Sequence, residues 1–217
     1  MKVLAINGSP RKNKNTAALL NKALEGSALK GAETEMINLY DLNYKGCISC
    51  FACKLIGGKS YGKCAYIDEL TPVLEKVRNA DVLILGSPIY FGDVTGEMRS
   101  FIERCLFPYL VYDKNYSSLV ESPKSVGLIY TMNITEDTAK DWGYNCILGL
   151  SEKYFGMVFG AAESLWVTDT YQFNDYSKYE TSAFDEKAKA KRKEEIFPID
   201  LEKAFAMGQK LVTNQLK

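Results

Sequence analysis

Lys2-Val3-Leu4-Ala5-Ile6-Asn7-Gly8-Ser9-Pro10-Arg11-Lys12-Asn13-Lys14-Asn15-Thr16 is the stretch of sequence that decides the fold. Its first part, 2–7, is the apolar run of a buried strand, and a helix is predicted from about Asn15, where apolar residues recur at helical spacing. The loop between them, 8–16, carries serine, asparagine and threonine together with three basic side chains. In α/β proteins, phosphate groups bind where a strand-end loop enters a helix. The stretch therefore predicts an α/β protein with an anion site after its first strand.

Strands and helices alternate along the rest of the chain in the same way. This alternation implies a parallel sheet with right-handed crossover connections. Five strands in 217 residues predict a flavodoxin-like three-layer sandwich with strand order 2-1-3-4-5, in which ligands bind at the carboxyl ends of the strands. The later strands are expected at 33–39, 81–86, 126–130 and within 157–167, and the later helices from Thr71, after Thr95, at 137–155 and over 201–212.

Two segments stand apart from this pattern within what we expect to be a single domain over residues 1–217. A cysteine-rich insert, 44–67, follows the second strand. A polar, tyrosine-rich and then strongly charged stretch, 168–195, precedes the last helix. We expect this second stretch to be a surface extension of the domain.

Composition excludes several classes of function. Lys+Arg and Asp+Glu are both 27, so the chain has no net field to attract nucleic acid or an anionic membrane. No apolar run approaches the length of a membrane span, and the start of the chain is too short for a signal-peptide core. We therefore expect a cytoplasmic protein, in which the six cysteines are free thiols or metal ligands. The chain has no histidine, which excludes Ser-His-Asp and Cys-His catalysis.

Four of the cysteines lie close together in the insert, as Cys47-x2-Cys50-x2-Cys53-x10-Cys64. Three thiols at two-residue gaps can converge on one point from a single tight loop, which is typical of an iron–sulfur ligand set. Zinc is a weaker interpretation because it prefers paired knuckles or histidine partners. A disulfide switch or a set of reduced thiols is also compatible with this pattern. The remaining cysteines, Cys105 and Cys146, are expected to be packing residues.

At two places the chain resembles a known family. Asn7-Gly8-Ser9-Pro10-Arg11 with Asn15-Thr16 resembles the FMN phosphate loop of NADPH-dependent FMN reductases and of the iron–sulfur flavoproteins related to them. Gly86-Ser87-Pro88-Ile89-Tyr90-Phe91-Gly92, followed by Gly96-Glu97-Met98-Arg99-Ser100-Phe101, is similar to the second flavin loop of this family. The resemblance covers residues 1–135 well and the remainder more loosely.

The resemblance implies FMN contacts in three loops at strand ends. The first loop would hold the phosphate, the second would line the isoalloxazine ring, and the third would border the other edge of that ring. The residues so implied are Ser9, Arg11, Asn15 and Thr16, then Pro88, Ile89, Tyr90, Phe91 and Gly92, and finally Thr131, Met132 and Asn133. The residues themselves are compatible with this, because a helix start with polar and basic side chains suits a monophosphate. Tyr90 and Phe91 offer flat apolar surface to a ring, although alone they would be interpreted as core aromatics.

The cysteine motif also matches the iron–sulfur members of the family, with one departure. Cys47, Cys50 and Cys53 match the first three positions of their motif, whereas the ten-residue gap before Cys64 is longer than those members usually have. The gap is rich in glycine, and closing a loop that is a few residues longer costs little free energy. The resemblance thus implies these four cysteines as ligands of a [4Fe–4S] cluster, with reduced thiols as the alternative.

The function implied by the resemblance is that of an FMN-binding oxidoreductase, which transfers electrons from NAD(P)H to a small acceptor such as a flavin or quinone. The cofactor would carry the chemistry, and no catalytic side chain is expected. Two alternatives stay open: a [4Fe–4S] flavoprotein that exchanges electrons with a ferredoxin-like partner, and a flavodoxin-like FMN carrier without NAD(P)H turnover. The family also implies a homodimer or higher homo-oligomer, in which the insert and the extension could contribute to the flavin pocket of the neighbouring chain.

Overall fold

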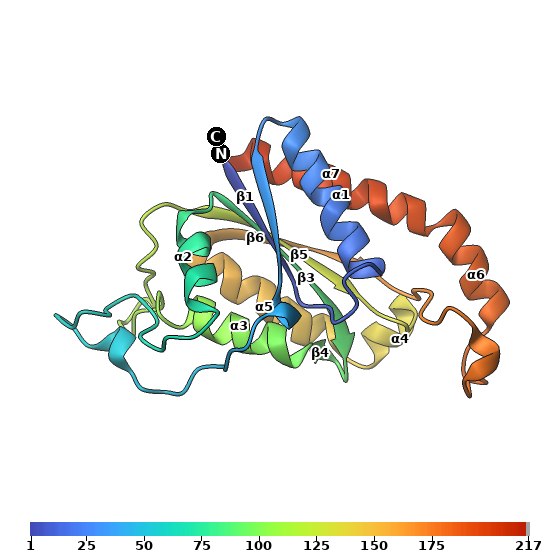
Figure 1. Cartoon of the computed structure of the whole chain (residues 1–217), viewed down its shortest axis with the longest axis horizontal. Coiled ribbons are helices and arrows are strands. Elements are labelled where there is room, and N and C mark those ends of the chain that lie inside the picture. The colour runs from blue at the N-terminus through green and yellow to red at the C-terminus, as the bar shows by residue number, and fades with distance from the viewer. Residues whose placement is uncertain (216–217) are drawn as a thin grey trace.

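The computed structural model describes residues 1–215 and has a parallel sheet between two layers of helices (Figure 1). The parallel strands are β1 (Lys2–Asn7), β2 (Glu33–Asn38), β3 (Val82–Tyr90), β5 (Lys124–Thr131) and β6 (Gly160–Val167). Their order in the sheet is β2-β1-β3-β5-β6, which confirms the predicted flavodoxin-like fold and the order of its five parallel strands. The predicted strand count is corrected by β4 (Asp93–Val94), a short sixth strand that pairs antiparallel with β3.

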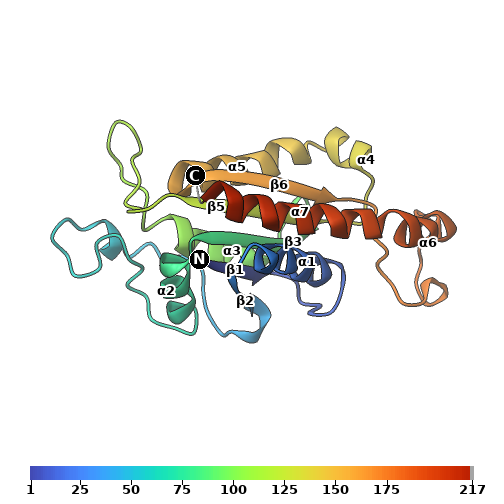
Figure 2. The same ribbon diagram turned by 90° about the horizontal axis from the view of Figure 1, so that it is seen from above.

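Helices cover both faces of this sheet, as the two perpendicular views show (Figures 1 and 2). One face is covered by α1 (Asn15–Leu29) and α7 (Phe197–Gln215). The other is covered by α2 (Thr71–Asn79), α3 (Gly96–Leu106) and α5 (Tyr144–Phe159). Two shorter helices, α4 (Glu136–Asp141) and α6 (Glu186–Glu195), and three 3-10 turns at Leu39–Asp41, Ala52–Lys54 and Tyr176–Lys178 complete the described elements.

The two faces of the sheet have separate cores because side chains alternate along each strand. In β1, Val3 and Ala5 pack with α1 and α7, whereas Leu4 and Ile6 pack with the helices of the opposite face. The three inner strands, β1, β3 and β5, are buried on both faces, which explains the nearly continuous apolar runs of β1 and β3 in the sequence.

Several local predictions need correction. The helix predicted at 137–155 is two helices, α4 and α5, separated at Gly143, whose φ of +77° is not helical. The strand predicted to end at Gly86 runs on to Tyr90, because it pairs with β5 as far as Pro88 and with β4 at Ile89 and Tyr90. Cys105 is buried at 1% exposure, as expected of a packing residue, whereas Cys146 is exposed and that prediction was wrong.

A pair of glycines lets α1 and α7 approach closely. A Cβ placed on Gly26 would lie 2.1 Å from the carbonyl oxygen of Phe205, and a Cβ on Gly208 would lie 1.9 Å from that of Ala23. Both contacts are with backbone atoms, which a rotamer change cannot relieve. Glycine at these two positions therefore sets the distance between the two helices.

The two segments outside the alternating pattern lie toward opposite ends of the molecule. The cysteine insert projects beside α2, and the segment 168–195, with α6, lies at the other end near the start of α1 (Figures 1 and 2). Over residues 1–215, no helix is both long and apolar enough to cross a membrane.

Candidate functional site

The loop after β1 and the C-terminal half of β3 are bonded directly to each other. The amide N–H of Gly8 donates to the carbonyl of Gly86 (2.8 Å), and the Thr95 hydroxyl donates to the carbonyl of Gly8 (2.8 Å). The Thr95 side chain also caps α3 by accepting from the N–H of Met98. A Cβ on Gly8 would lie 2.9 Å from Met98 Cβ, so this approach requires glycine. Two loops far apart in the sequence thus form one rigid edge.

Two of the side chains predicted to hold a phosphate also have hydrogen-bond partners within the protein. Ser9 is buried, and its hydroxyl accepts from the N–H of Arg11 (3.2 Å). Thr16 is buried as well, and its hydroxyl is hydrogen-bonded to the hydroxyl of Thr131 at the end of β5 (2.8 Å). The latter bond ties the first predicted loop to the third. Ser9, Thr16 and Thr131 therefore lie together at the carboxyl edge of the sheet.

The start of α1 suits an anion. Within residues 1–215 no side chain caps its N-terminus, and no acidic residue lies in its first turn. The first N–H groups of a helix have no partner within the helix, and its dipole makes that end positive. Arg11, Lys12 and Lys14 add nearby positive charge. These features fit a phosphate group bound chiefly by backbone N–H groups.

The other two predicted phosphate residues bind a segment of the same chain. The Arg11 guanidinium donates to the carbonyl of Gln172 (2.7 Å), and the Asn15 amide donates to the carbonyl of Tyr171 (3.1 Å). The segment 168–179, which sequence patterns indicated only as a surface extension, thus lies across the first loop.

The second predicted loop is a tight hairpin between β3 and β4. Phe91 (φ +52°) and Gly92 (φ +87°) form its turn in the left-handed region. Phe91 is fully exposed and Tyr90 is 45% exposed, so the interpretation of these two as core aromatics is wrong. Ile89 and Pro88 are half-buried below them. The hairpin therefore presents exposed, flat aromatic side chains next to the first loop.

The third predicted loop follows β5. Thr131 and Met132 are buried at 4% exposure each, and the backbone carbonyl of Asn133 accepts from Lys189 of α6 (2.8 Å). The side-chain Oδ1 of Asn133 is buried and has no hydrogen-bond partner among the described residues. A buried amide oxygen of this kind can accept a hydrogen bond from an N–H group of a ligand.

The four cysteines of the insert line one small cavity of about 20 Å³, room for roughly one water molecule. Cys53 is buried, Cys64 is half-buried, and Cys47 and Cys50 are exposed. Burial raises the pKa of the Cys53 thiol. In residues 1–215, no three His, Cys, Asp or Glu side chains are arranged to hold a single metal ion. The donor set has the chemistry of a thiolate-ligated cluster, but the cavity as folded is too small to contain one.

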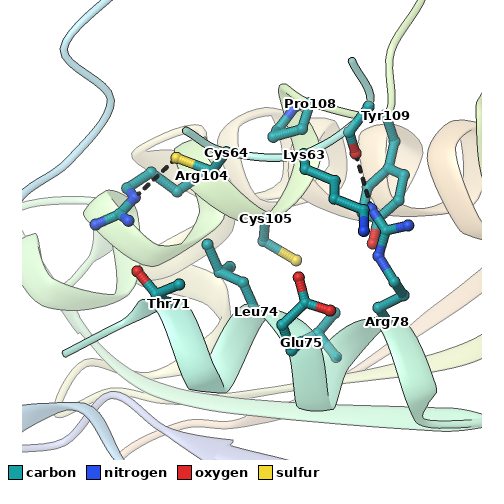
Figure 3. A pocket seen from close by; sticks show the side chains of 12 residues that line it. Lys63, Cys64, Thr71, Leu74, Glu75, Arg78, Arg104, Cys105, Pro108 and Tyr109 are labelled. Atoms are coloured by element: carbon teal, nitrogen blue, oxygen red, sulfur yellow. Dashed lines mark hydrogen bonds between the residues drawn. The ribbon is translucent and has the colours of Figure 1, made fainter. Parts of the chain in front are cut away.

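A buried arginine that sequence reasoning missed holds both ends of this insert. The Arg104 side chain has 0% exposure and donates to Cys64 Sγ (3.4 Å), to the carbonyls of Lys45 (3.1 Å) and Tyr66 (2.7 Å), and to the carboxylate of Asp68. Figure 3 shows the contact with Cys64 beside a pocket between α2 and α3. No spacing in the sequence indicated it, because Arg104 is one of several charged residues on α3, beside Glu97, Arg99 and Glu103, and its burial comes from contacts with the distant insert.

Further contacts dock the insert on the C-terminal end of α3. The N–H of Cys47 donates to the Glu103 carboxylate (3.0 Å), and the Lys54 ammonium donates to the carbonyls of Phe107 and Leu110. Burial lowers the pKa of Lys54. The cysteine cavity and the second loop are therefore at opposite ends of α3. From Gly96 to residue 104, the helix rises about 12 Å.

Residues 1–130 match the sequence pattern of a protein family described as NADPH-dependent FMN reductase. The chain belongs to this family. The match covers more than half of the chain, including β1, the first loop, β3 and the hairpin, and it confirms the family resemblance stated from the sequence.

Curated relatives are described more specifically than the family as a whole. Iron-sulfur flavoproteins of Methanocaldococcus jannaschii and of Archaeoglobus fulgidus are each 43% identical to this chain over 104 residues, or 48% of it. These matches cover 51% and 48% of the two relatives, so the chain spans about half the length of the curated relatives it matches.

Solved structures agree on the fold. An NAD(P)H:quinone oxidoreductase from Methanothermobacter marburgensis has a TM-score of 0.69 at 16% identity, over 97% of this chain and 96% of that one. An azoreductase from Bacillus anthracis has a TM-score of 0.66 at 18% identity, over 97% and 99% of the two chains. At such identities the likeness concerns the flavodoxin-like fold alone.

Proposed function

We propose that this protein binds FMN at the carboxyl edge of its sheet and works as an oxidoreductase. The observation that carries the proposal is the junction of three loops from β1, β3 and β5, next to a helix start that no side chain caps. Membership of the FMN reductase family supports the same cofactor.

Each loop has a distinct part in this proposal. The N–H groups at the start of α1, with Ser9, Arg11, Asn15 and Thr16, hold the phosphate. Pro88, Ile89, Tyr90, Phe91 and Gly92 line the ring, and the free Oδ1 of Asn133, next to Thr131 and Met132, accepts from an N–H at the ring's edge. FMN held by these residues would supply hydride acceptance and electron transfer. The chain's part is to bind and orient the cofactor.

The electron donor is NAD(P)H, and the acceptor is a small flat molecule such as a flavin or quinone. The exposure of Tyr90 and Phe91 supports this part of the proposal, because aromatic faces stack on planar ligands. Steady-state oxidation of NADH or NADPH by FMN-loaded protein, with each acceptor in turn, tests it. FMN binding without NAD(P)H oxidation would favour a flavodoxin-like carrier instead.

The binding site itself is tested by two substitutions in the first loop. Ser9→Ala and Thr16→Ala are each expected to weaken FMN binding by about 1–3 kcal/mol, because each removes a polar partner at a charged group. Fluorescence titration with FMN gives the dissociation constants. Ser118→Ala, in a loop far from the site, serves as the control. Unchanged affinity in both loop variants would place the phosphate elsewhere.

A second candidate function rests on the cysteine cavity. That Cys47, Cys50, Cys53 and Cys64 all line one cavity supports a [4Fe–4S] flavoprotein, as do the names of the relatives. Loading would require the exposed thiols to move outward, since the present cavity is small. Iron and acid-labile sulfide are measured on anaerobically purified protein. About four irons per chain would support the cluster, whereas iron-free protein that binds FMN would leave the thiols reduced. A ferredoxin-like partner is part of this candidate only.

We also propose that the chain forms a homo-oligomer. The α5 surface exposes Ile147, Leu150 and Tyr154, each 40–49% exposed, and the hairpin exposes Phe91 nearby. Apolar side chains gathered on one surface favour burial against another chain. Light scattering coupled to size-exclusion chromatography measures the state, and a monomer with full FMN affinity would exclude a pocket shared between chains.

A further inference from the structure

The segment 168–179, which we call the strap, bridges two of the three proposed flavin loops. It leaves β6 and first bonds the loop after β5: the N–H of Asp169 donates to the carbonyl of Ile134 (2.7 Å), and that of Thr170 to the carbonyl of Met132 (3.0 Å). It then reaches the loop after β1. The strap therefore spans the site from its third loop to its first.

Three consecutive contacts join the strap to the phosphate loop. The carbonyl of Tyr171 accepts from Asn15, and the carbonyl of Gln172 accepts from Arg11. The Asn174 side chain accepts from the ammonium of Lys14 (2.8 Å). All three acceptors are uncharged, and all three donors belong to residues at the start of α1. The strap thus occupies the outer side of the helix start on which the proposed phosphate lies.

The strap is held in this position by its own packing. Tyr176 is 2% exposed, and its hydroxyl accepts from the N–H of Gln172 (3.0 Å). Its ring packs against Tyr171 and Phe173, with centroid distances of 4.8 and 5.1 Å. Tyr179 stacks on Phe173 at 4.2 Å. The four rings make this part of the strap a compact unit.

A buried lysine anchors the start of the strap. Lys189 of α6 is 3% exposed and is paired with the carboxylate of Asp169, while it also donates to the carbonyl of Asn133. Asp169 has a φ of +50°, which turns the chain from β6 toward the site. The strap is therefore fixed at its start by an ion pair and at its middle by the aromatic unit.

We propose that the strap determines which flavin this protein accepts, by closing the pocket beyond the phosphate so that a flavin ending in a phosphate monoester fits and a dinucleotide does not. The inference rests on the proposed FMN site. FMN ends at its phosphate, whereas in FAD a second phosphate and an adenosine continue outward from that group. That continuation would need the space that residues 171–174 occupy, and it would break their bonds to Arg11, Lys14 and Asn15.

The test loosens the strap without changing the phosphate loop. In the Asn174→Ala/Tyr176→Phe variant, the acceptor of Lys14 and the hydroxyl bonded to Gln172 are removed, while the aromatic ring stays. Tyr179→Phe is the matched control, because it makes the same chemical change in the same strap and keeps the stacking on Phe173. Dissociation constants of FMN, FAD and riboflavin are measured by fluorescence titration, and hydrogen exchange reports how far 170–176 opens.

We expect the wild type to prefer FMN to FAD, and this preference to fall by about tenfold in the double variant, which corresponds to about 1.4 kcal/mol. Riboflavin has no phosphate, so its affinity stays unchanged, and Tyr179→Phe behaves as the wild type. A double variant with faster exchange in the strap and an unaltered FMN-to-FAD preference would overturn the inference. An equal change for riboflavin would also overturn it, because the strap would then act on the ring. A wild type that binds no flavin would instead refute the proposed function.

Discussion

The buried arginine behind the cysteine cavity gives the sharpest stability prediction. Replacing Arg104 with Met removes a guanidinium of 0% exposure from a carboxylate, Asp68, whose side chain is only 13% exposed. It also removes the donors of the Lys45 and Tyr66 carbonyls. Breaking a buried ion pair from one side costs about 3–5 kcal/mol, because the remaining charge is left without a partner. Asp68 keeps an N–H donor from Leu70 (3.0 Å), so we expect a loss near the lower end, about 3 kcal/mol.

The same helix offers a matched control for this experiment. Arg99, five residues earlier on α3, pairs with Asp93, but these side chains are 42% and 37% exposed. Exposed pairs contribute about 0.2–1 kcal/mol, so Arg99→Met should have a small effect. Urea unfolding followed by circular dichroism gives the free energy of unfolding for each variant.

A double variant separates the lost attraction from the stranded charge. Arg104→Met/Asp68→Asn removes both charges, and we expect it to be more stable by about 0.5–3 kcal/mol than the sum of the single effects predicts. If Arg104→Met costs no more than Arg99→Met, or if the double variant shows no such coupling, then Arg104 does not hold the insert as argued.

Two further predictions concern helix glycines and alkaline pH. Gly208→Ala puts a Cβ 1.9 Å from the Ala23 carbonyl, and we expect it to destabilise the protein by at least about 1–3 kcal/mol. Gly149→Ala in α5, where a Cβ meets nothing within 4 Å, should stabilise the protein by about 0.5–1 kcal/mol. If the two variants change the thermal stability equally, the close contact of α1 with α7 is contradicted. Burial raises the pKa of the Cys105 thiol from 9.0 to about 12, so this thiol ionises at a lower pH in the unfolded chain than in the folded protein. Its contribution to stability is therefore complete below pH 9.0 and is lost as the pH rises from 9.0 to about 12. The stability difference between wild type and Cys105→Ala should fall by up to about 1.4 kcal/mol per pH unit across this range in urea unfolding, and a constant difference would argue against burial as the cause.

The fold could be predicted because its signals are local. Apolar runs such as 2–7 and 81–86 mark strands that are buried on both faces, and the helices between them have a regular apolar spacing. What failed depends on contacts that no local pattern contains. The continuation of β3 to Tyr90 needs the partner strand β4, and the division of the helix at 137–155 follows from a left-handed Gly143.

The candidate site could be predicted only in its outline. The sequence placed three loops at one edge of the sheet: the contacts among Gly8, Gly86 and Thr95 join the first two, and the bond between Thr16 and Thr131 joins the first to the third. The covering of the first loop by the strap could not be foreseen, because its acceptors are backbone carbonyls at Tyr171 and Gln172. A backbone carbonyl has the same chemistry in every residue, so it leaves no trace in residue identity.

The predicted phosphate residues have hydrogen-bond partners within the protein. The Thr16 hydroxyl is bonded to Thr131, and the side chains of Arg11 and Asn15 reach the strap. Polar side chains in a strand-end loop must first satisfy the loop, because an unsatisfied buried group costs about 1–3 kcal/mol. The anion can then be bound by backbone N–H groups at the start of α1, which are free whatever residues stand there. Substitution of Thr16 therefore tests both the phosphate site and the bond to Thr131. Thr131→Val removes that bond and leaves the Thr16 hydroxyl in place, so it separates the two: if it weakens FMN binding as much as Thr16→Ala does, Thr16 acts by holding the loops together.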